Sequence, residues 1–261
     1  MGDLARLRHR LRELGAVTVA FSGGADSGFL AWVAHDTLGR RAHAVTAVSP
    51  SLAPDERDDC AALAREWGLR WTAVETDELA RAAYVANGPD RCYHCKAELM
   101  DVVAPLAVAE AATVVLGTNV DDLGDHRPGQ DAAAERGAVF PLVEAAFTKE
   151  AVREASRALG LRTWNKPAAA CLASRLPYGT PVTVEVLGRV GRAEAALRAL
   201  GFDQLRVRHY GDVARVELDE QVLVTAVERR AEIVAALKSS GYRYVTLDLE
   251  GFRSGNLNAA L

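Results

Sequence analysis

The chain has 261 residues, of which 49% are hydrophobic and 25% are charged, and its formal net charge is −4. This balance is typical of a globular protein with a buried core, and no segment approaches the roughly 20 consecutive apolar residues of a membrane-spanning helix. The acidic balance counts against a nucleic-acid partner, because proteins that bind phosphate backbones usually carry a basic excess or patch.

Strand-like and helix-like patterns alternate along the first 160 residues. The amphipathic helix expected at residues 3–14 lacks the continuous apolar stretch of a secretory signal, so we expect a soluble cytoplasmic protein. Strands are predicted at 17–21, 42–48, 70–75 and 113–117, and helices at 27–38, 54–67, 96–111 and 148–160. This alternation predicts an α/β fold with a doubly wound parallel sheet covered by helices on both faces.

Two connections, at residues 76–95 and 121–141, are predicted to be long and irregular, as functional loops often are. Trp164 is expected in the core. After the turn-forming residues 177–181 the pattern changes to a helix at 184–200, a hairpin of 204–210 and 213–219, a helix at 220–239 and a strand at 242–248. We therefore expect two domains, residues 1–180 and a smaller α+β domain at 181–261.

Residues 22–27, SGGADS, have the composition of a phosphate-binding loop and are called the phosphate loop below. The loop follows the first predicted strand, at the edge where open α/β sheets bind ligands. Gly23 and Gly24 permit close approach of an anion, and the hydroxyls of Ser22 and Ser27 supply donors. No lysine follows the loop as in G-x-x-x-x-G-K-[ST], so transfer of a γ-phosphate is not expected, and Asp26 is a candidate Mg²⁺ ligand. The alternative is a tight turn followed by a helix cap.

Residues 117–122, GTNVDD, follow the strand at 113–117 and are called the second loop. The two loops together resemble the nucleotide site of the PP-loop ATP pyrophosphatase superfamily. Members of this superfamily cleave ATP between the α- and β-phosphates and form an adenylate and pyrophosphate. The resemblance implies that Asn119 and Asp122 bind ATP; the alternative is that the acidic pair belongs to a solvated turn.

Three of the four cysteines lie where thiolates could bind a metal or cluster. Cys92 and Cys95 have C-x-x-C spacing on a turn expected to lead into a helix, and Cys171 lies on another irregular segment. Three thiolates on a [4Fe–4S] cluster leave one iron open, whereas a structural zinc site needs a fourth ligand that His94 is poorly placed to supply. A zinc knuckle, a redox pair, and an isolated buried Cys171 remain alternatives. Cys60 is expected to be a packing residue within a helix.

Arginines near the C-terminal half form a second group of candidates. Arg206 and Arg208 alternate with apolar residues on a predicted strand, so both project to one face and could bind a phosphate or carboxylate. An exposed strand made soluble by charge is an equal alternative. Ser174 and Arg175 follow Cys171 closely and are candidate catalytic residues with it, whereas Glu217 is expected to pair with an arginine.

Several motifs, taken together, resemble the LarE family of ATP-dependent sulfur transferases of nickel-pincer nucleotide synthesis. They are the phosphate loop, RCYHCK at 91–96, Gly124-Asp125-x-Arg127-Pro128-Gly129, Lys166-Pro167-x-x-x-Cys171-Leu172-Ala173-Ser174-Arg175 and Gly251-Phe252-Arg253-Ser254-Gly255. The resemblance extends over nearly the whole chain. The phosphate loop indicates only the superfamily, whereas the last two motifs are much more specific to the family.

The resemblance implies an adenine nucleotide alpha hydrolase-like fold and a substrate, pyridinium-3,5-biscarboxylic acid mononucleotide, whose carboxylates become thiocarboxylates. Some family members sacrifice one cysteine, at the position of Cys171, and others pass on a sulfide from a [4Fe–4S] cluster held by three cysteines. Because Cys92 and Cys95 accompany Cys171, we expect the cluster type, with ATP and Mg²⁺ as further cofactors. A homo-oligomer is also implied.

Other functions share parts of this pattern. A tRNA thiolase shares the adenylation loop and often three cysteines, but the acidic balance and the absence of a recognisable RNA-binding module count against it. An amide-forming synthetase would leave the cysteines unexplained. A nucleotide-binding sensor on the same sheet would release no pyrophosphate. We therefore expect a small nucleotide substrate, with no nucleic-acid or membrane partner.

Overall fold

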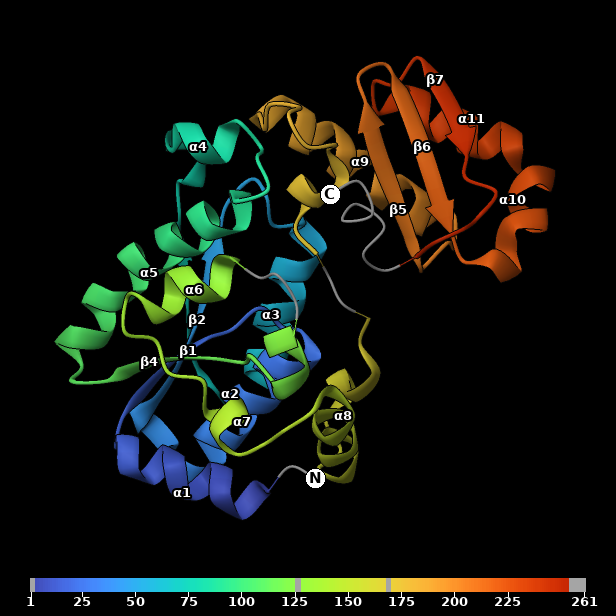
Figure 1. The fold of residues 1–261 in the computed structure, drawn as a ribbon. Helices are drawn as coiled ribbons and strands as arrows, with labels where there is room; N and C mark the ends of the chain where they lie inside the picture. The colour runs from blue at the N-terminus through green and yellow to red at the C-terminus, as the bar shows by residue number, and fades with distance from the viewer. Residues whose placement is uncertain (1–2, 125–127, 168–169, 254–261) are drawn as a thin grey trace. The chain divides into compact units, whose positions relative to one another are not determined.

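The computed structural model of the protein describes residues 3–124, 128–167 and 170–253 (Figure 1). The chain divides into two compact units. The first comprises Met1–Ser49, Pro54–Tyr84 and Pro89–Ala169, and the second comprises Pro50–Ala53, Val85–Gly88 and Ala170–Leu261. The boundary between independently folding domains near residue 180 stays a prediction. Four residues of the motifs quoted above lie outside the described residues, namely Asp125, Arg127, Ser254 and Gly255.

The first unit is built on a parallel sheet whose strand order is β3-β2-β1-β4. Its main elements in chain order are α1 (Leu4–Leu14), β1 (Val17–Ala20), α2 (Ala25–Leu38), β2 (Ala42–Val48), α3 (Pro54–Glu66), β3 (Arg70–Glu75), α4 (Ala82–Val85), α5 (Arg91–Ala109), β4 (Thr113–Leu116), α6 (Pro128–Ala134), α7 (Pro141–Glu144) and α8 (Lys149–Ala158). Short 3-10 turns join them, among them η3 (Val120–Gly124) and η4 (Arg162–Asn165). The predicted doubly wound α/β fold is confirmed.

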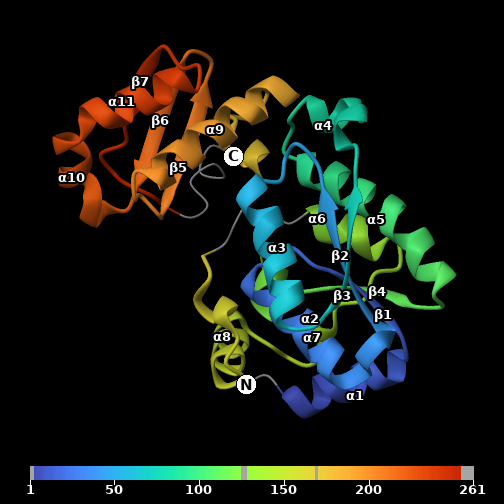
Figure 2. The ribbon, with the colours of Figure 1, turned by 180° about the vertical axis from the view of Figure 1, so that it is seen from behind.

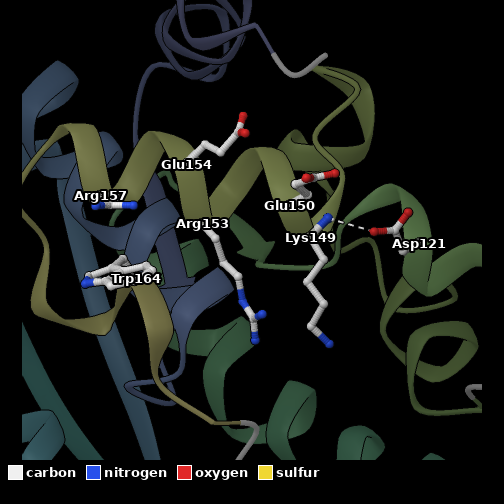
Figure 3. A pocket seen from close by; sticks show the side chains of 7 residues that line it. All are labelled: Asp121, Lys149, Glu150, Arg153, Glu154, Arg157 and Trp164. Atoms are coloured by element: carbon white, nitrogen blue, oxygen red, sulfur yellow. Dashed lines mark hydrogen bonds between the residues drawn. The ribbon is translucent and has the colours of Figure 1, made fainter.

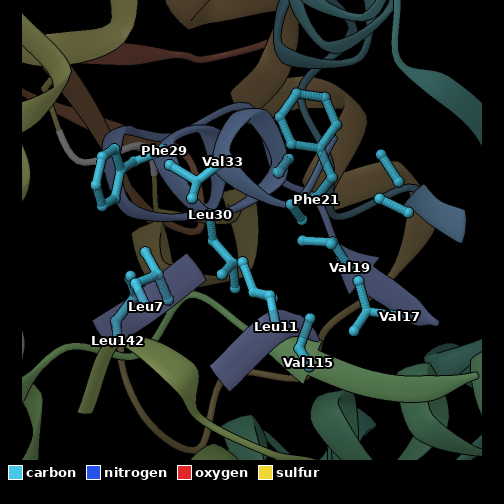
Figure 4. Close-up of a cluster of buried hydrophobic side chains, with 14 of the residues drawn as sticks. Leu7, Leu11, Val17, Val19, Phe21, Phe29, Leu30, Val33, Val115 and Leu142 are labelled. Atoms are coloured by element: carbon cyan, nitrogen blue, oxygen red, sulfur yellow. The ribbon is translucent and has the colours of Figure 1, made fainter. Parts of the chain in front are cut away.

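Helices cover both faces of this sheet (Figures 1 and 2). Alternating side chains of the strands pack against these helices. On one face, Val17 and Val19 of β1 and Val115 of β4 join the apolar residues of α1, α2, α3 and α7 (Figure 4). On the other face, Val114 and Leu116 pack with α5 and α6. This double coverage fixes the sheet, so the loops at its carboxyl edge start from a rigid base.

The two connections predicted to be irregular contain helices. α5 begins at Arg91 rather than at residue 96, so both cysteines of the C-x-x-C pair lie in its first turn. The side chain of Asp90 makes no capping bond, and this turn is supported by packing instead. A Cβ atom at Gly129 would lie 3.0 Å from the Cys92 carbonyl oxygen, so glycine allows α6 to approach α5 closely. Tertiary packing of this kind is not visible in a local sequence pattern.

The second unit contains a mixed three-stranded sheet in the order β5-β6-β7. Its elements are η5 (Leu172–Arg175), α9 (Val184–Ala199), β5 (Leu205–Tyr210), β6 (Val213–Leu218), η6 (Glu220–Val222), α10 (Leu223–Glu228), α11 (Arg230–Ser239) and β7 (Tyr244–Leu247). The predicted hairpin is confirmed, because β5 and β6 pair antiparallel. The helix expected over 220–239 is broken at Arg229, whose guanidinium donates to the Leu200 carbonyl at 2.8 Å.

None of the helices in the described part of the chain has both the length and the apolar character needed to cross a lipid bilayer.

Candidate functional site

The two predicted nucleotide loops lie at the same switch point of the parallel sheet. β2 lies on one side of β1 and β4 lies on the other, so the chain changes direction between β1 and β4. The phosphate loop follows β1 and leads into α2, and the second loop follows β4 and leads into η3. Open α/β sheets bind ligands at the carboxyl ends of strands at such a point. The fold thus brings together two segments about 90 residues apart in sequence.

The phosphate loop is shaped by bonds between its own residues. The Ser22 N–H donates to Ser27 Oγ at 3.2 Å, and the two hydroxyl oxygens lie 3.0 Å apart. Gly23 has a φ of 69°, a backbone conformation that other residues rarely adopt. Gly24 is the N-cap of α2 and gives no side-chain cap to the first N–H groups of this helix. Those N–H groups and the positive end of the helix dipole suit an anion such as phosphate.

The second loop packs directly on the start of α2. A Cβ atom at Gly117 would lie 2.8 Å from both the Cα and the backbone N of Ser27, so a side chain there would displace the phosphate loop. Asn119 is fully buried, and its Nδ2 donates to Asp26 Oδ1 at 3.2 Å. The Asn119 N–H donates to Asp122 at 3.1 Å. Asn119 and Asp122 therefore shape the loop, and their contact with ATP stays a prediction.

Asp26 supplies a partly buried carboxylate between these loops. Burial raises the pKa of Asp26 above its ordinary value, and the charge of Asp122 adds to this effect. The hydrogen bond from Asn119 and the positive charges of Lys149 and Arg153 act in the opposite direction. A carboxylate oxygen is the hard donor that Mg²⁺ prefers, and a cation here would offset the cost of burying the charge. Asp26 is therefore suited to bind Mg²⁺, as expected from the sequence, and that it does so stays a prediction.

Two further side chains lie beside Gly23. Cys60 is fully buried, and its Sγ lies 2.8 Å from the position a Gly23 Cβ would take, which confirms the expected packing role. Burial raises the pKa of Cys60 to about 11, so the thiol is protonated at neutral pH. The Lys166 Nζ lies 3.7 Å from the same position and 2.7 Å from the carboxylates of Glu56 and Asp59. Sequence analysis did not assign Lys166 to this site; its only signal was its place in a family motif.

The C-x-x-C pair lies in the first turn of α5, in the first unit. Cys92 is exposed and Cys95 is half-buried. Residues three apart on a helix share one face, so the two sulfurs can bind one group together. The pair therefore fits two of the three ligands expected for the cluster.

Cys171 belongs to the second unit and precedes η5. The Arg175 Nη1 donates to the Ala170 and Cys171 carbonyl oxygens at 2.8 and 3.1 Å, and to Ser174 Oγ at 2.9 Å. The other side of this guanidinium forms a buried, bidentate ion pair with Glu194 of α9. Arg175 and Ser174 hold the backbone around Cys171 through these bonds. The catalytic roles expected for Ser174 and Arg175 stay predictions. The hydrogen bonds of these two residues position the backbone of Cys171.

Arg206 and Arg208 differ in their surroundings although both lie on β5. Arg208 is buried in a bidentate ion pair with Glu217, as expected for Glu217, and also donates to the Ser174 carbonyl at 2.8 Å. Arg206 lies over the Phe252 ring, with its guanidinium carbon 4.9 Å from the ring centroid. Burial and the nearby charges of other arginines lower the pKa of Arg206 to about 10. The second unit thus joins the predicted substrate-binding arginines to the Cys171 segment.

Within each unit taken alone, no three Cys, His, Asp or Glu side chains of the described residues form a group suited to a metal ion. The expected cluster needs Cys92 and Cys95 from one unit and Cys171 from the other, and their meeting stays a prediction.

Trp164 is not in the core: it is 36% exposed, because η4 turns Thr163 inward toward Gly28 of α2 and Trp164 outward.

Comparisons with known proteins give similarity over almost the whole chain. An uncharacterised protein of Synechocystis is 48% identical over 99% of this chain and 97% of its own length. The pyridinium-3,5-bisthiocarboxylic acid mononucleotide synthase of Lactiplantibacillus plantarum is 40% identical over 98% of this chain and 94% of its own length. An uncharacterised protein of Methanocaldococcus jannaschii is 25% identical over 96% of this chain. No protein-family model matches the chain.

The protein is an α/β protein of the PP-loop superfamily. Its parallel sheet has a loop of glycines and serines after the first strand, and a second loop lies at the same switch point. The chain is 40% identical to the synthase from L. plantarum over nearly its full length, and this similarity identifies the family within the superfamily. The chain belongs to the LarE family.

Proposed function

We propose that this protein is an ATP-dependent sulfur transferase that converts pyridinium-3,5-biscarboxylic acid mononucleotide into the bisthiocarboxylic acid. The observation that carries the proposal is the pairing of the phosphate loop and the second loop at the switch point of the sheet. The full-length similarity to the synthase that is named for this product supports the choice of substrate.

Activation of the carboxylate is the first step of the proposed reaction. A substrate carboxylate oxygen attacks the α-phosphorus of ATP, and pyrophosphate leaves with the electron pair of the broken phosphorus–oxygen bond. The phosphate loop binds the polyphosphate, and Asp26 would hold Mg²⁺, which would offset the negative charge of the phosphates. This step turns a poor electrophile into an acyl adenylate, whose carbonyl carbon has AMP as a leaving group.

Sulfur transfer is the second step, in which a sulfur nucleophile attacks the activated carbon and AMP leaves with the former carboxylate oxygen. A [4Fe–4S] cluster held by Cys92, Cys95 and Cys171 would supply a sulfide from its open iron. The placement of two of these cysteines in one helical turn supports this source. Arg175 and Glu194 fix the segment that carries Cys171, since a nucleophile must stay within contact distance while water is excluded.

Substrate binding is assigned to the arginines of β5. Burial and the positive charges of Arg175, Arg208 and Arg198 lower the pKa of Arg206, with Glu194 acting in the opposite direction, and a bound anion would favour the charged guanidinium. The substrate phosphate or second carboxylate is an anion of this kind. We further propose that the protein acts as a cytoplasmic homo-oligomer, as its family resemblance implies, without a nucleic-acid or membrane partner.

The test is pyrophosphate release from ATP by protein purified without oxygen, with and without the carboxylate substrate. We expect release only when substrate is present, and a strong loss of release for Asp26→Asn. Release in response to tRNA, or none with any carboxylate, would contradict the proposal. Iron and labile sulfide before turnover, and the intact mass afterwards, identify the sulfur source. An iron-free active protein that loses H₂S at Cys171 would replace the cluster by sacrifice of that cysteine.

A further inference from the structure

The motif at residues 251–253 lies against the sheet of the second unit, and the proposed reaction gives it no role. It follows β7, which pairs with β6. The Asp248 N–H donates to the Val216 carbonyl oxygen at 2.8 Å, and the Phe252 N–H donates to the Leu218 carbonyl oxygen at 2.7 Å. These two bonds hold the segment to the end of β6.

Gly251 makes the turn that places Phe252. Its φ is 71°, in the left-handed region that favours glycine. A Cβ atom at this position would lie 3.0 Å from the Leu218 carbonyl oxygen, which is the acceptor of the Phe252 N–H. A side chain at residue 251 would therefore disturb both the turn and the hydrogen bond that follows it.

The Phe252 ring contacts the guanidinium of Arg206 on β5. The guanidinium carbon lies 4.9 Å from the ring centroid, within the range of cation–π attraction. The face of the ring attracts the positive charge without using an N–H group as a conventional hydrogen bond would. The contact can therefore fix the guanidinium and still leave its N–H groups to bind a carboxylate or phosphate.

Burial distinguishes this contact from a similar one at the surface. Arg157 of α8 lies 5.2 Å from the Trp164 ring centroid, and Arg157 is exposed (Figure 3). Arg206 and Phe252 are both half-buried, and the attraction between a cation and a ring is stronger where water is excluded. Burial lowers the pKa of Arg206 to about 10, so the ring stabilises a charge that burial disfavours.

We propose that Phe252 is a positioning residue for the substrate, which holds the Arg206 guanidinium ready for the phosphate or second carboxylate. The inference rests on the proposed function, in which Arg206 binds that anion. An arginine side chain loses rotamer freedom when it is fixed, and a contact that fixes it before the substrate arrives lowers the cost of binding. Because Phe252 acts through Arg206, it affects the affinity for substrate rather than the chemical step.

The test measures the binding of pyridinium-3,5-biscarboxylic acid mononucleotide by calorimetry, and the steady-state kinetics of pyrophosphate release. Phe252→Leu removes the ring but keeps an apolar side chain. We expect about fivefold weaker binding and an equally raised KM for this substrate, with kcat within about twofold of the wild type. Phe252→Tyr keeps the ring and is expected to bind as the wild type does. The unfolding midpoint in urea shows whether each variant is folded.

A double-mutant cycle shows whether Phe252 acts through Arg206. In the Arg206→Met background, Phe252→Leu is expected to cause no further loss of substrate affinity, because the guanidinium that the ring holds is already absent. Losses that add in the double variant would overturn the inference. Wild-type affinity of the folded Phe252→Leu variant would overturn it as well.

Tyr244→Leu is the matched control, because it removes another ring that lies beside an arginine in the same unit. The guanidinium carbon of Arg243 lies 5.3 Å from the Tyr244 ring centroid, but Tyr244 is 53% exposed. We expect this variant to bind substrate as the wild type does, and an equal loss for Tyr244→Leu and Phe252→Leu would contradict a specific role of Phe252. A wild type that binds no carboxylate substrate overturns the proposed function, and the inference with it. Unchanged binding by Phe252→Leu overturns the inference alone.

Discussion

At the scale of single residues, Gly117 sets how closely the two nucleotide loops approach. It follows β4, and its missing side chain leaves room for the backbone of Ser27. Gly→Ala at this position forces two backbone segments apart, which cannot be relieved by rotating a side chain. The identity of one small residue therefore controls the geometry of the phosphate loop.

We predict that Gly117→Ala lowers the free energy of unfolding by about 2 kcal/mol, the usual cost of overpacking, and weakens ATP binding. The measurement is urea unfolding together with ATP titration. Gly188→Ala is the matched control: it lies inside α9 and would meet only the flexible end of Arg192. Alanine there favours the helix, so stability stays equal or rises. Gly117→Ala with unchanged stability and affinity would refute the close-approach argument.

The reactivity of individual thiols follows from their burial. Cys60 has a pKa raised to about 11 and no exposed surface, whereas Cys92 is exposed. The thiolate is the reactive form, and a raised pKa means that it forms only as the pH approaches 11. In metal-free native protein at about pH 8.5, the ordinary pKa of a free thiol, we predict that iodoacetamide modifies Cys92 and leaves Cys60 intact.

Peptide mass spectrometry measures this modification, and unfolding in urea provides the control in which both thiols react. Equal rates for Cys60 and Cys92 in the native state would show that the helix α3 does not shield the thiol as described.

At the scale of elements, the start of α8 is joined to the second loop by two caps. Thr148 accepts a hydrogen bond from the Ala151 N–H at 3.1 Å, and Asp121 accepts from the Lys149 N–H at 2.8 Å. Removing a cap acceptor typically costs about 1 kcal/mol of stability. We predict this loss in urea unfolding for Asp121→Ala, and a smaller loss for Asp121→Asn, which keeps an oxygen acceptor. Equal stability of Asp121→Ala and the wild type would show that the second loop does not hold α8.

The turn η5 and the helix α9 are joined by the buried pair of Arg175 and Glu194. Burial alone would raise the pKa of Glu194, but the hydrogen bonds and charge of Arg175 hold it below its ordinary value of 4.5. A lowered carboxyl pKa gives stability that is fully present above the unfolded value and is lost as the pH falls through the native one. Glu194→Gln leaves buried arginine charge uncompensated, so we predict a loss of about 3 kcal/mol at neutral pH.

The pH dependence gives this prediction a second measurement. The difference in unfolding free energy between the wild type and Glu194→Gln should shrink as the pH falls below 4.5, because the unfolded chain protonates this carboxyl first and the native state does so only at a lower pH. Glu185→Gln is the control, because its ion pair with Arg189 is 79% exposed on the glutamate side and contributes under about 1 kcal/mol. A difference that does not vary with pH would contradict the role of the ionised pair.

Sequence patterns predicted elements well where local signals determine them. The four strands of the first unit were found within one or two residues, because apolar runs bounded by turns mark buried parallel strands. The early start of α5 and the break at Arg229 were missed, because both depend on contacts between elements. The same limit hid Lys166, which reaches the phosphate loop from a distant segment.

At the scale of the whole molecule, the chain distributes its candidate chemistry between two compact units. The first holds the phosphate loop, the second loop and the C-x-x-C pair; the second holds Cys171 and the arginines of β5. The proposed transfer of sulfur to an activated carboxylate would use both sets of residues. The central claim is that the substrate carboxylate first forms an adenylate with AMP, and that AMP then leaves with one of the carboxylate oxygens.

The most direct measurement follows that oxygen. Substrate labelled with heavy oxygen in its carboxylates is incubated with ATP and protein purified without oxygen, and the AMP is analysed by mass spectrometry. The account predicts one labelled oxygen in each AMP formed, matched by one carboxylate oxygen replaced by sulfur. Unlabelled AMP, or ADP and phosphate in place of AMP and pyrophosphate, would contradict it.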